Sequence, residues 1–257
     1  MKQFIVDAFT EKIFSGNPAA VCVVDKFPSE KLMLNIAREN NLSETAFVMR
    51  DGENFRLRWF TPATEIDLCG HATLATGFVI LTQYEKNLPA VNFETLSGTL
   101  TVTRNEKLFE MNFPAYKPKK IPVTDAMSDA IGAKVLEAYI DRDLLMILDS
   151  AATVENLKPN QKKLAALDGL IQAVTAADEN FDCVSRIFAP KISIAEDPVT
   201  GSTHCMIAPY WANKFGKKKI LARQASERGG ILHCEISGER VKVSGSAVLF
   251  AVAELNI

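Results

Sequence analysis

The strongest constraint on how this chain can fold is a five-residue motif that occurs twice. The segment RWFTP at residues 58–62 returns as RIFAP at residues 186–190, so the pattern R-x-F-x-P recurs after 128 residues, close to half of the 257-residue chain. A repeat at this distance indicates two halves of similar structure. A single short match can arise by chance. The two copies must therefore agree at further points before a duplication is inferred.

Two further agreements lie on either side of the motif. Eighteen residues before its proline stand Glu44 in the first copy and Gln172 in the second, each two residues after a leucine. After the proline, a glycine opens a segment of small residues: Gly70 in CGHAT and Gly201 in TGSTH, with three extra residues in the second copy. Three agreements in the same order predict a duplicated domain.

The segments between these points predict an α+β fold. Runs typical of strands, such as residues 3–9 and 20–25, alternate with a capped amphipathic segment that favours a helix and starts at Ser29. We expect two similar halves, residues 1–115 and 116–257, with a ligand site between them and with the last strands free to return to either half.

Composition excludes several function classes. Lys and Arg number 29 against 31 Asp and Glu, and they form no basic stripe, so the sequence argues against nucleic-acid binding. No apolar run approaches the ~18 residues of a membrane span, and the first apolar run is too short for a signal peptide. The five cysteines are scattered, without a C-x-x-C pair, which is typical of a reducing compartment. We therefore expect a soluble cytoplasmic protein.

The two glycine segments are candidate anion sites. A glycine that opens a helix leaves backbone N–H groups exposed at the positive end of the helix dipole, where a carboxylate or phosphate binds well. The hydroxyls of Thr200 and Ser202 suit the same task, or simple helix capping. From spacing alone, Gly70 and Gly201 could equally open two ordinary helices.

Few residues could act as an acid or a base. Glu44 stands where a helix ends and an apolar strand begins, so it is either a desolvated carboxylate or an exposed turn residue. Asp197 precedes a proline and the second glycine segment, as either a site residue or a turn aspartate. His71 could donate to a substrate carboxylate or move a proton, or it could be structural.

The sequence gives little support for a zinc site, a serine hydrolase or a dinucleotide-binding site. Cys69, His71, His204 and Cys205 match a tetrahedral zinc site in number, but the adjacent His204 and Cys205 would point to different faces of one element. The chain has no G-x-S-x-G nucleophile motif and no G-x-G-x-x-G dinucleotide motif. We expect no metal and no cofactor.

Five segments in collinear order resemble one known family. The segments DAFTEKIFSGNPAAVCVV, NNLSETAFV, RWFTPATEIDLCGHATLA, EDPVTGSTHC and RVKVSGSAV are similar to those of the PhzF family, the phenazine-biosynthesis isomerases and their relatives on the diaminopimelate epimerase fold. The resemblance covers nearly the whole chain.

The resemblance implies a fold, a site and an assembly. The fold has two pseudo-symmetric halves, each a mixed sheet around a central helix, and the protein is a homodimer. The glutamate of SETAF is the proton-transfer base. The resemblance assigns the base to Glu44 and the pocket lining to His71, Asp197 and Ser202, with Gly70 and Gly201 at the helix entrances.

Cys69 bears on whether the protein is a two-cysteine epimerase or an isomerase with a single base. Epimerases on this fold use two cysteines, one at each helix entrance, but the position that matches the second one holds Thr200. A threonine hydroxyl is far too weakly acidic to replace a thiol. We therefore expect a cofactor-independent isomerase that moves a proton on a small carboxylate-bearing metabolite. An epimerase that uses Cys69 and a non-catalytic metabolite-binding protein are the alternatives.

Overall fold

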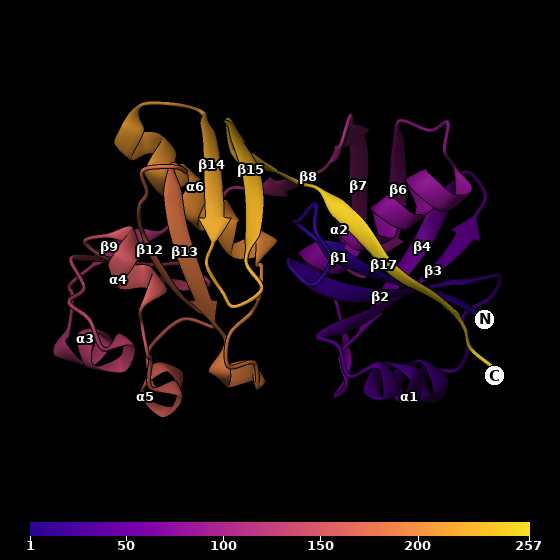
Figure 1. Cartoon of the computed structure of the whole chain (residues 1–257), viewed down its shortest axis with the longest axis horizontal. Helices are drawn as coiled ribbons and strands as arrows, with labels where there is room; N and C mark the ends of the chain where they lie inside the picture. Colours follow the sequence, from indigo (N-terminus) through magenta and orange to yellow (C-terminus); the bar gives the residue numbers. More distant parts are fainter. The chain divides into compact units, whose positions relative to one another are not determined.

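The computed structural model describes residues 1–257 and divides into two compact units (Figure 1). Unit 1 comprises Met1–Asn112 together with Ser244–Ile257, and unit 2 comprises Phe113–Val243. The chain leaves unit 1 after Asn112 and returns to it at Ser244, so the last strand belongs to unit 1. No helix in the structure combines the length and the apolarity needed to cross a membrane.

Unit 1 is a mixed sheet that surrounds one central helix. The strands pair in the order β17–β1–β2–β3–β4–β6–β7–β8, and the β2–β3 and β4–β6 pairs are parallel. Its elements are β1 Lys2–Ala8, β2 Asn17–Val24, α1 Glu30–Asn40, β3 Glu44–Asp51, β4 Asn54–Phe60, β5 Glu65–Ile66, α2 Gly70–Val79, the π-helix η1 Ile80–Tyr84, β6 Ala90–Thr95, β7 Gly98–Asn105, β8 Leu108–Pro114 and β17 Ala247–Glu254.

Unit 2 is built in the same way. The strands pair in the order β9–β10–β11–β12–β13–β14–β15, with parallel β11–β12 and β13–β14 pairs. Its elements are β9 Lys119–Ile121, α3 Asp125–Ile131, β10 Glu137–Ile140, β11 Leu144–Ile147, α4 Ala151–Glu155, α5 Gln161–Ala165, β12 Gln172–Ala177, β13 Cys183–Phe188, the 3-10 helix η2 Pro190–Ile192, α6 Gly201–Phe215, β14 Lys219–Gln224 and β15 Gly230–Ser237. Strand β16, Arg240–Gly245, begins in unit 2 and ends in unit 1.

The two units repeat one topology. The run β2–β3–β4–β6–β7 and the run β11–β12–β13–β14–β15 both pair in the order parallel, antiparallel, parallel, antiparallel. In each run the long central helix, α2 or α6, connects the third strand to the fourth, as a parallel crossover requires. The predicted α+β class with two similar halves is confirmed.

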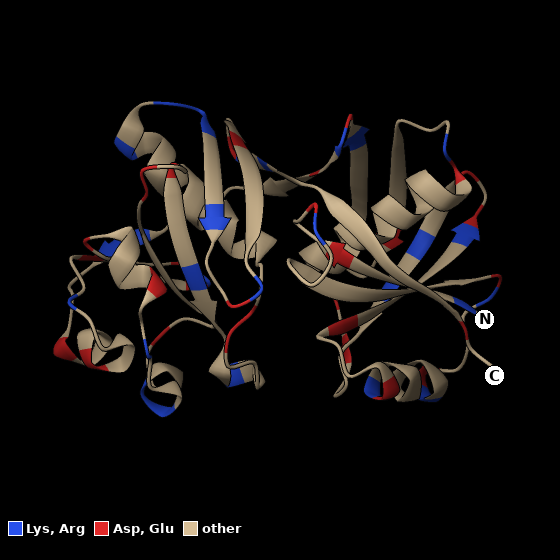
Figure 2. Cartoon of the chain, viewed as in Figure 1, with Lys and Arg blue, Asp and Glu red and all other residues tan.

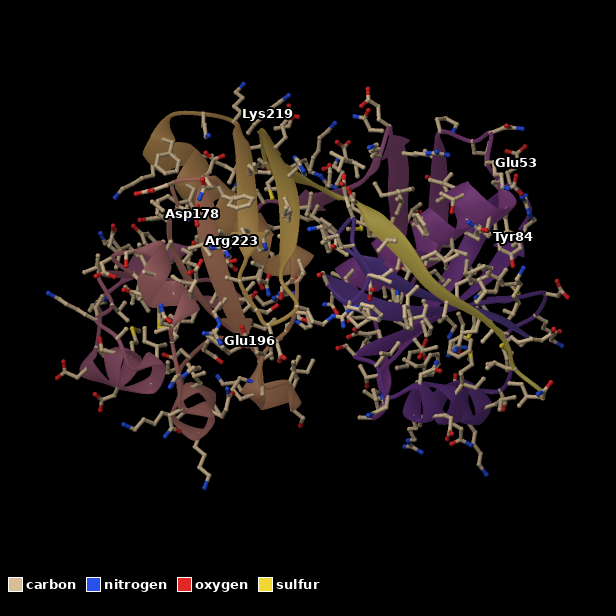
Figure 3. The ribbon with its side chains drawn as sticks, viewed as in Figure 1. Glu53, Tyr84, Asp178, Glu196, Lys219 and Arg223 are labelled. Carbon is tan, nitrogen blue, oxygen red and sulfur yellow. The ribbon has the colours of Figure 1, made fainter.

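The repeated R-x-F-x-P motif builds the same ion pair twice. Arg58 forms a two-pronged pair with Glu65 at 2.7 and 2.6 Å, and Arg186 forms one with Glu196, labelled in Figure 3, at 2.8 and 2.7 Å. Each guanidinium also stacks over the phenylalanine two residues later, at 5.4 and 5.3 Å. Each glutamate stands four residues before the N-cap of the central helix, so the pair fixes where that helix begins.

The structure corrects one correspondence drawn from the sequence. Thr45 pairs with Phe60 across β3 and β4, whereas Gln172 pairs with Phe188 across β12 and β13. Because the two phenylalanines hold the same place in the repeated motif, Gln172 is the counterpart of Thr45 and not of Glu44. The spacing between the paired residues is one residue longer in the second copy, and a slip of one residue moves a side chain to the other face of the sheet.

Gln172 accordingly has a structural task on the outer face of its sheet. Its amide donates to the backbone carbonyls of Asp168 and Gly169 at 3.2 and 3.1 Å. The counterpart of Glu44 is then Ile171, a buried apolar residue. Only the first copy carries a carboxylate at this position, which gives the two halves different chemistry.

The central helix of unit 1, α2, is buried on nearly all sides and has no acidic residue, lysine or arginine. It is therefore uniformly tan in Figure 2. Strands β1, β2, β3 and β7 pack around it, and nearly all of its residues are buried. Close packing needs a small residue at one contact, because a Cβ on Gly77 would lie 2.5 Å from Cγ1 of Val102 in β7.

Candidate active site

Three chemically active side chains meet at the start of α2. Glu44 is the first residue of β3, Cys69 is the N-cap of α2, and His71 lies in the first turn of that helix. His71 Nε2 is 3.1 Å from Glu44 Oε2, and His71 Nδ1 is 3.6 Å from Cys69 Sγ. Since β3 packs against α2, residues 25 apart in the sequence share one small volume.

All three residues are buried. Glu44 and Cys69 are each 7% exposed and His71 is 6% exposed. Although Glu44 Oε2 and His71 Nε2 are close enough for an ion pair, their angles are not those of a hydrogen bond, and each atom lacks a hydrogen-bond partner. The burial decides between the two readings of Glu44 from sequence: it is not an exposed turn residue.

Burial and charge set the protonation states of this cluster. Burial disfavours the imidazolium of His71, but the negative charges of Cys69 and Glu44 outweigh it, so the pKa of His71 lies well above its usual value. Burial, together with the Glu44 carboxylate, raises the pKa of the Cys69 thiol. Both shifts favour the protonated forms, the imidazolium of His71 and the thiol of Cys69.

Sequence reasoning missed Asn17, which completes the surroundings of His71. Asn17 opens β2, and its side-chain nitrogen lies 3.2 Å from His71 Nδ1. A side-chain amide offers a donor and an acceptor, so it can face Nδ1 in either protonation state after an amide flip. In the sequence Asn17 is part of a turn pattern before a proline. That pattern gives no indication of a contact with His71, which is 54 positions away.

The N-terminus of α2 is not capped by a side chain. Its N-cap Cys69 has extended backbone angles and makes no capping hydrogen bond, and the helix begins at Gly70. The backbone N–H groups of the first turn therefore keep their affinity for an anion. We call residues 69–71 the first helix entrance, and residues 200–202 at the start of α6 the second helix entrance.

The second helix entrance, in unit 2, has a different arrangement. Thr200 is the N-cap of α6, but its hydroxyl donates to Asp197 instead of capping the helix. Gln224 holds this turn, because it donates to the Asp197 carbonyl at 2.7 Å and accepts from the Thr200 backbone at 2.9 Å. Gly201 begins the helix, so backbone N–H groups remain available for an anion here also.

Ser202 contacts an ion pair, Arg142 with Asp143, that the sequence analysis did not identify. Arg142 donates to the Ser202 hydroxyl oxygen at 3.2 Å and binds the fully buried Asp143 at 3.0 and 2.8 Å. Because arginine has no acceptor, the Ser202 hydroxyl hydrogen must point to another group. Neither Arg142 nor Asp143 belongs to a recognisable sequence motif, so only the structure connects them to Ser202.

The other two residues of the zinc set that the sequence disfavoured, His204 and Cys205, bond within α6. His204 Nδ1 lies 2.8 Å from the carbonyl of Thr200, and Cys205 Sγ lies 3.7 Å from that of Gly201. Both side chains thus bind carbonyls of the first helical turn. Within unit 1, the partner that joins Cys69 and His71 is Glu44.

His204 makes stability depend on pH. Full burial lowers the pKa of its imidazole to about 4, so it stays neutral in the folded protein at pH values where an unfolded histidine, with a pKa near 6.5, takes up a proton. Between these values the unfolded chain binds more protons, and stability falls as the pH falls. We expect wild type to lose roughly 2 kcal/mol more between pH 7 and pH 5 than His204→Gln does, as measured by urea unfolding.

The control for this prediction is His233→Gln, which removes an exposed histidine of the same unit. It should keep the pH dependence of wild type. A His204→Gln variant with an unchanged pH dependence would show that the buried imidazole does not cause the effect.

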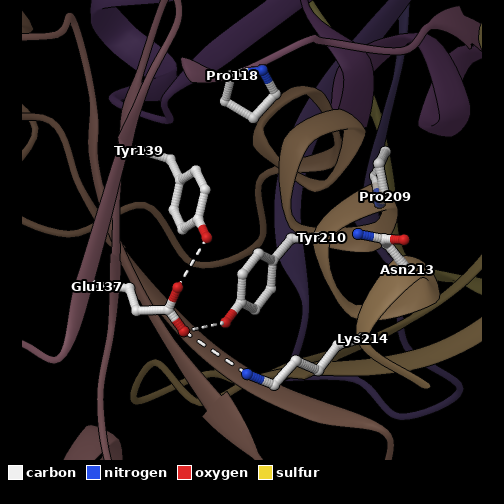
Figure 4. Close-up of a pocket in the computed structure, with 7 residues that line it drawn as sticks. All are labelled: Pro118, Glu137, Tyr139, Pro209, Tyr210, Asn213 and Lys214. Atoms are coloured by element: carbon white, nitrogen blue, oxygen red, sulfur yellow. Dashed lines mark hydrogen bonds and ion pairs between the residues drawn. The ribbon is translucent and has the colours of Figure 1, made fainter. Parts of the chain in front are cut away.

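A pocket elsewhere in unit 2 is less suited to catalysis. It has a volume of about 280 Å³ and contains Glu137 between Tyr139 and Tyr210 (Figure 4). The carboxylate pairs with Lys120 at 2.7 Å and accepts from Tyr139 at 2.8 Å, contacts that lower its pKa to about 2. It also lies 3.6 Å from Lys214. A carboxylate so fully satisfied is a weak base at neutral pH.

Comparison with known proteins agrees with this fold. The family model described as phenazine biosynthesis-like protein matches residues 6–253. A protein of Pseudomonas aeruginosa named as an uncharacterized isomerase is 45% identical over 99% of this chain and 98% of its own length. The crystal structure of a PhzF-family protein from Enterococcus faecalis is 46% identical, with a TM-score of 0.98 over 100% of this chain and 99% of that one.

A more distant structure shares only the fold. A probable proline racemase from Agrobacterium radiobacter superposes with a TM-score of 0.63 at 10% identity, over 100% of this chain and 93% of that chain. The architecture of this chain is therefore also found in racemase-like proteins.

Proposed function

Since the chain belongs to the PhzC-PhzF family of phenazine biosynthesis-like proteins, we propose that it is an isomerase that moves a proton on a small carboxylate-bearing metabolite without a cofactor. The observation that carries this proposal is the buried Glu44 carboxylate, 3.1 Å from His71 at an uncapped helix N-terminus. In this proposal Glu44 is the base, His71 is the cationic donor and the first helix entrance is the anion site, all within unit 1.

Each group has a step in the proposed reaction. Glu44 removes a proton from an allylic carbon, and the electron pair left behind spreads into the conjugated system toward an oxygen of the substrate. The His71 imidazolium and the N–H groups of Gly70 and the first turn stabilise that oxygen. The protonated Glu44 then returns the proton to another carbon of the same system, so no net proton or electron is gained or lost.

We assign the second helix entrance to substrate binding. The N–H groups that follow Gly201 suit a carboxylate, and the Ser202 hydroxyl adds a donor. The side chains of Thr200 and Asp197, which bond to each other, border this site. The Arg142 contact leaves the Ser202 hydroxyl free to donate, which favours an anionic partner. We place Asp197 in the lining of the substrate pocket, as the family resemblance implies.

An epimerase that uses Cys69 is less well supported. Such an enzyme needs a thiol and a thiolate, but burial raises the pKa of Cys69, and the matching Thr200 already donates its hydroxyl to Asp197. The likeness to a racemase at 10% identity concerns the fold alone. We therefore place Cys69 among the residues that contact the substrate.

We also propose a cytoplasmic homodimer. The homodimer follows from the family resemblance, and light scattering in solution measures it directly. The five cysteines are all free and buried, which favours a reducing compartment.

A ligand screen followed by isotope exchange tests the proposed function. Small mono- and dicarboxylates with an allylic C–H bond are screened by thermal shift, because a ligand that binds the folded state raises its melting temperature. Each hit is then incubated with enzyme in D₂O. The proposal expects deuterium to enter the hit at carbon. Hits that bind without any exchange would instead support the non-catalytic metabolite-binding protein.

A further inference from the structure

The first helix entrance has the composition of a metal site that the sequence spacing did not predict. The zinc set considered from sequence joined Cys69 and His71 to His204 and Cys205. In the structure Glu44 joins them instead, and the carboxylate oxygen, thiol sulfur and imidazole nitrogen lie within 4.8 Å of one another. Glu44 and Cys69 are 25 positions apart in the sequence, too far for a short motif to join them.

We propose that Glu44, Cys69 and His71 bind a zinc-like divalent cation and that this cation inhibits the enzyme. The inhibition rests on the proposed function of Glu44 as the base, whereas the binding itself does not. A metal that holds the Glu44 oxygen occupies the electron pair that would otherwise accept the substrate proton.

A second observation points to a ligand at this place. Glu44 Oε2 and His71 Nε2 lie 3.1 Å apart in residues more than nine-tenths buried, and neither makes a hydrogen bond in the structure. Buried polar atoms are nearly always paired. A cation that both atoms contact would satisfy them at once.

The ligand types select the class of cation. One carboxylate, one imidazole and one thiolate form a borderline-soft set, typical of zinc sites with three protein ligands and an open fourth position. Calcium and magnesium require several oxygen ligands, and this cluster has a single carboxylate. The charges also balance, because two anionic ligands offset a doubly charged cation in a buried site.

The binding step is a ligand exchange without a redox change. Bonds form from the cation to Glu44 oxygen, His71 nitrogen and Cys69 sulfur. The protons of the Cys69 thiol and of the His71 imidazolium pass to solvent as these bonds form.

Cobalt(II) titration of the metal-free protein, without substrate, tests the proposal. We expect one equivalent to bind with the absorption of a tetrahedral cobalt site and a thiolate-to-cobalt charge-transfer band, both removed by added zinc. Cys69→Ser should lose the charge-transfer band. Cys69→Ser, His71→Asn and Glu44→Gln should each lower the affinity at least tenfold, since loss of an outer partner alone costs about 10–100-fold.

Cys22→Ala is the matched control, because it removes another buried cysteine of unit 1 that lies outside the cluster. It should bind cobalt as wild type does, and thermal unfolding checks that every variant folds. The proposal is overturned if wild type gives no charge-transfer band or if Cys69→Ser binds cobalt with unchanged affinity. Because the titration uses no substrate, its failure leaves the isotope-exchange test of function untouched.

Discussion

Glu44→Gln is expected to lose substrate-dependent deuterium exchange by roughly 10²–10⁴-fold, the usual contribution of a positioned base. Glutamine has nearly the same size as glutamate but cannot take up a proton at neutral pH, so the variant removes the base while it keeps the packing against His71. The measurement is deuterium incorporation by NMR into a ligand found in the screen, with enzyme variants at equal concentration.

The control for this prediction is Glu53→Gln, which changes an exposed glutamate of unit 1 labelled in Figure 3. It should exchange deuterium at the wild-type rate. Equal melting temperatures for Glu44→Gln and wild type would exclude a folding defect. Exchange that persists in Glu44→Gln but disappears in Cys69→Ala would refute the assignment of the base and favour the epimerase alternative.

Gly77→Ala is expected to destabilise unit 1 by roughly 1–3 kcal/mol, although alanine is normally the better helix former. An added methyl group would lie 2.5 Å from Cγ1 and 2.9 Å from Cγ2 of the fully buried Val102. The gain in helix propensity, about 0.5–1 kcal/mol, is too small to offset this overlap. Urea unfolding at neutral pH measures the change.

A double-mutant cycle identifies the cause of that loss. In a Val102→Ala background both Cγ atoms are absent, so Gly77→Ala should cost less than it does in wild type. If Gly77→Ala instead stabilised the protein by the amount typical of an exposed helix position, the close packing of α2 against β7 would not hold.

Much of the fold could be predicted from the sequence because a duplicated domain repeats short motifs in the same order along the chain. The R-x-F-x-P motif predicted two similar halves, and the structure shows why that motif recurs: Arg58 and Arg186 each anchor a glutamate just before a central helix. Such a pair lies within about ten residues, so sequence spacing can reveal it.

The sequence prediction that Gln172 is the counterpart of Glu44 was wrong because it relied on counting residues along the chain. Counting residues back from the proline ignored one extra residue in the second copy. Strand side chains alternate between two faces, so that single residue placed Gln172 on the outer face of its sheet and gave the inward position to Ile171. The asymmetry of the two halves, with a carboxylate in only one, depends on this register.

The sequence by itself determined the fold class, the two helix entrances and the candidates Glu44, His71 and Asp197, because these follow from local patterns and from family resemblance. Only the tertiary structure decided that Glu44 is buried against His71 with Cys69 beside them, that Asn17 completes that cluster, and that Arg142 orients Ser202. The physical reason is distance along the chain: these contacts join residues up to 60 positions apart, and packing of strands against the central helices brings them together.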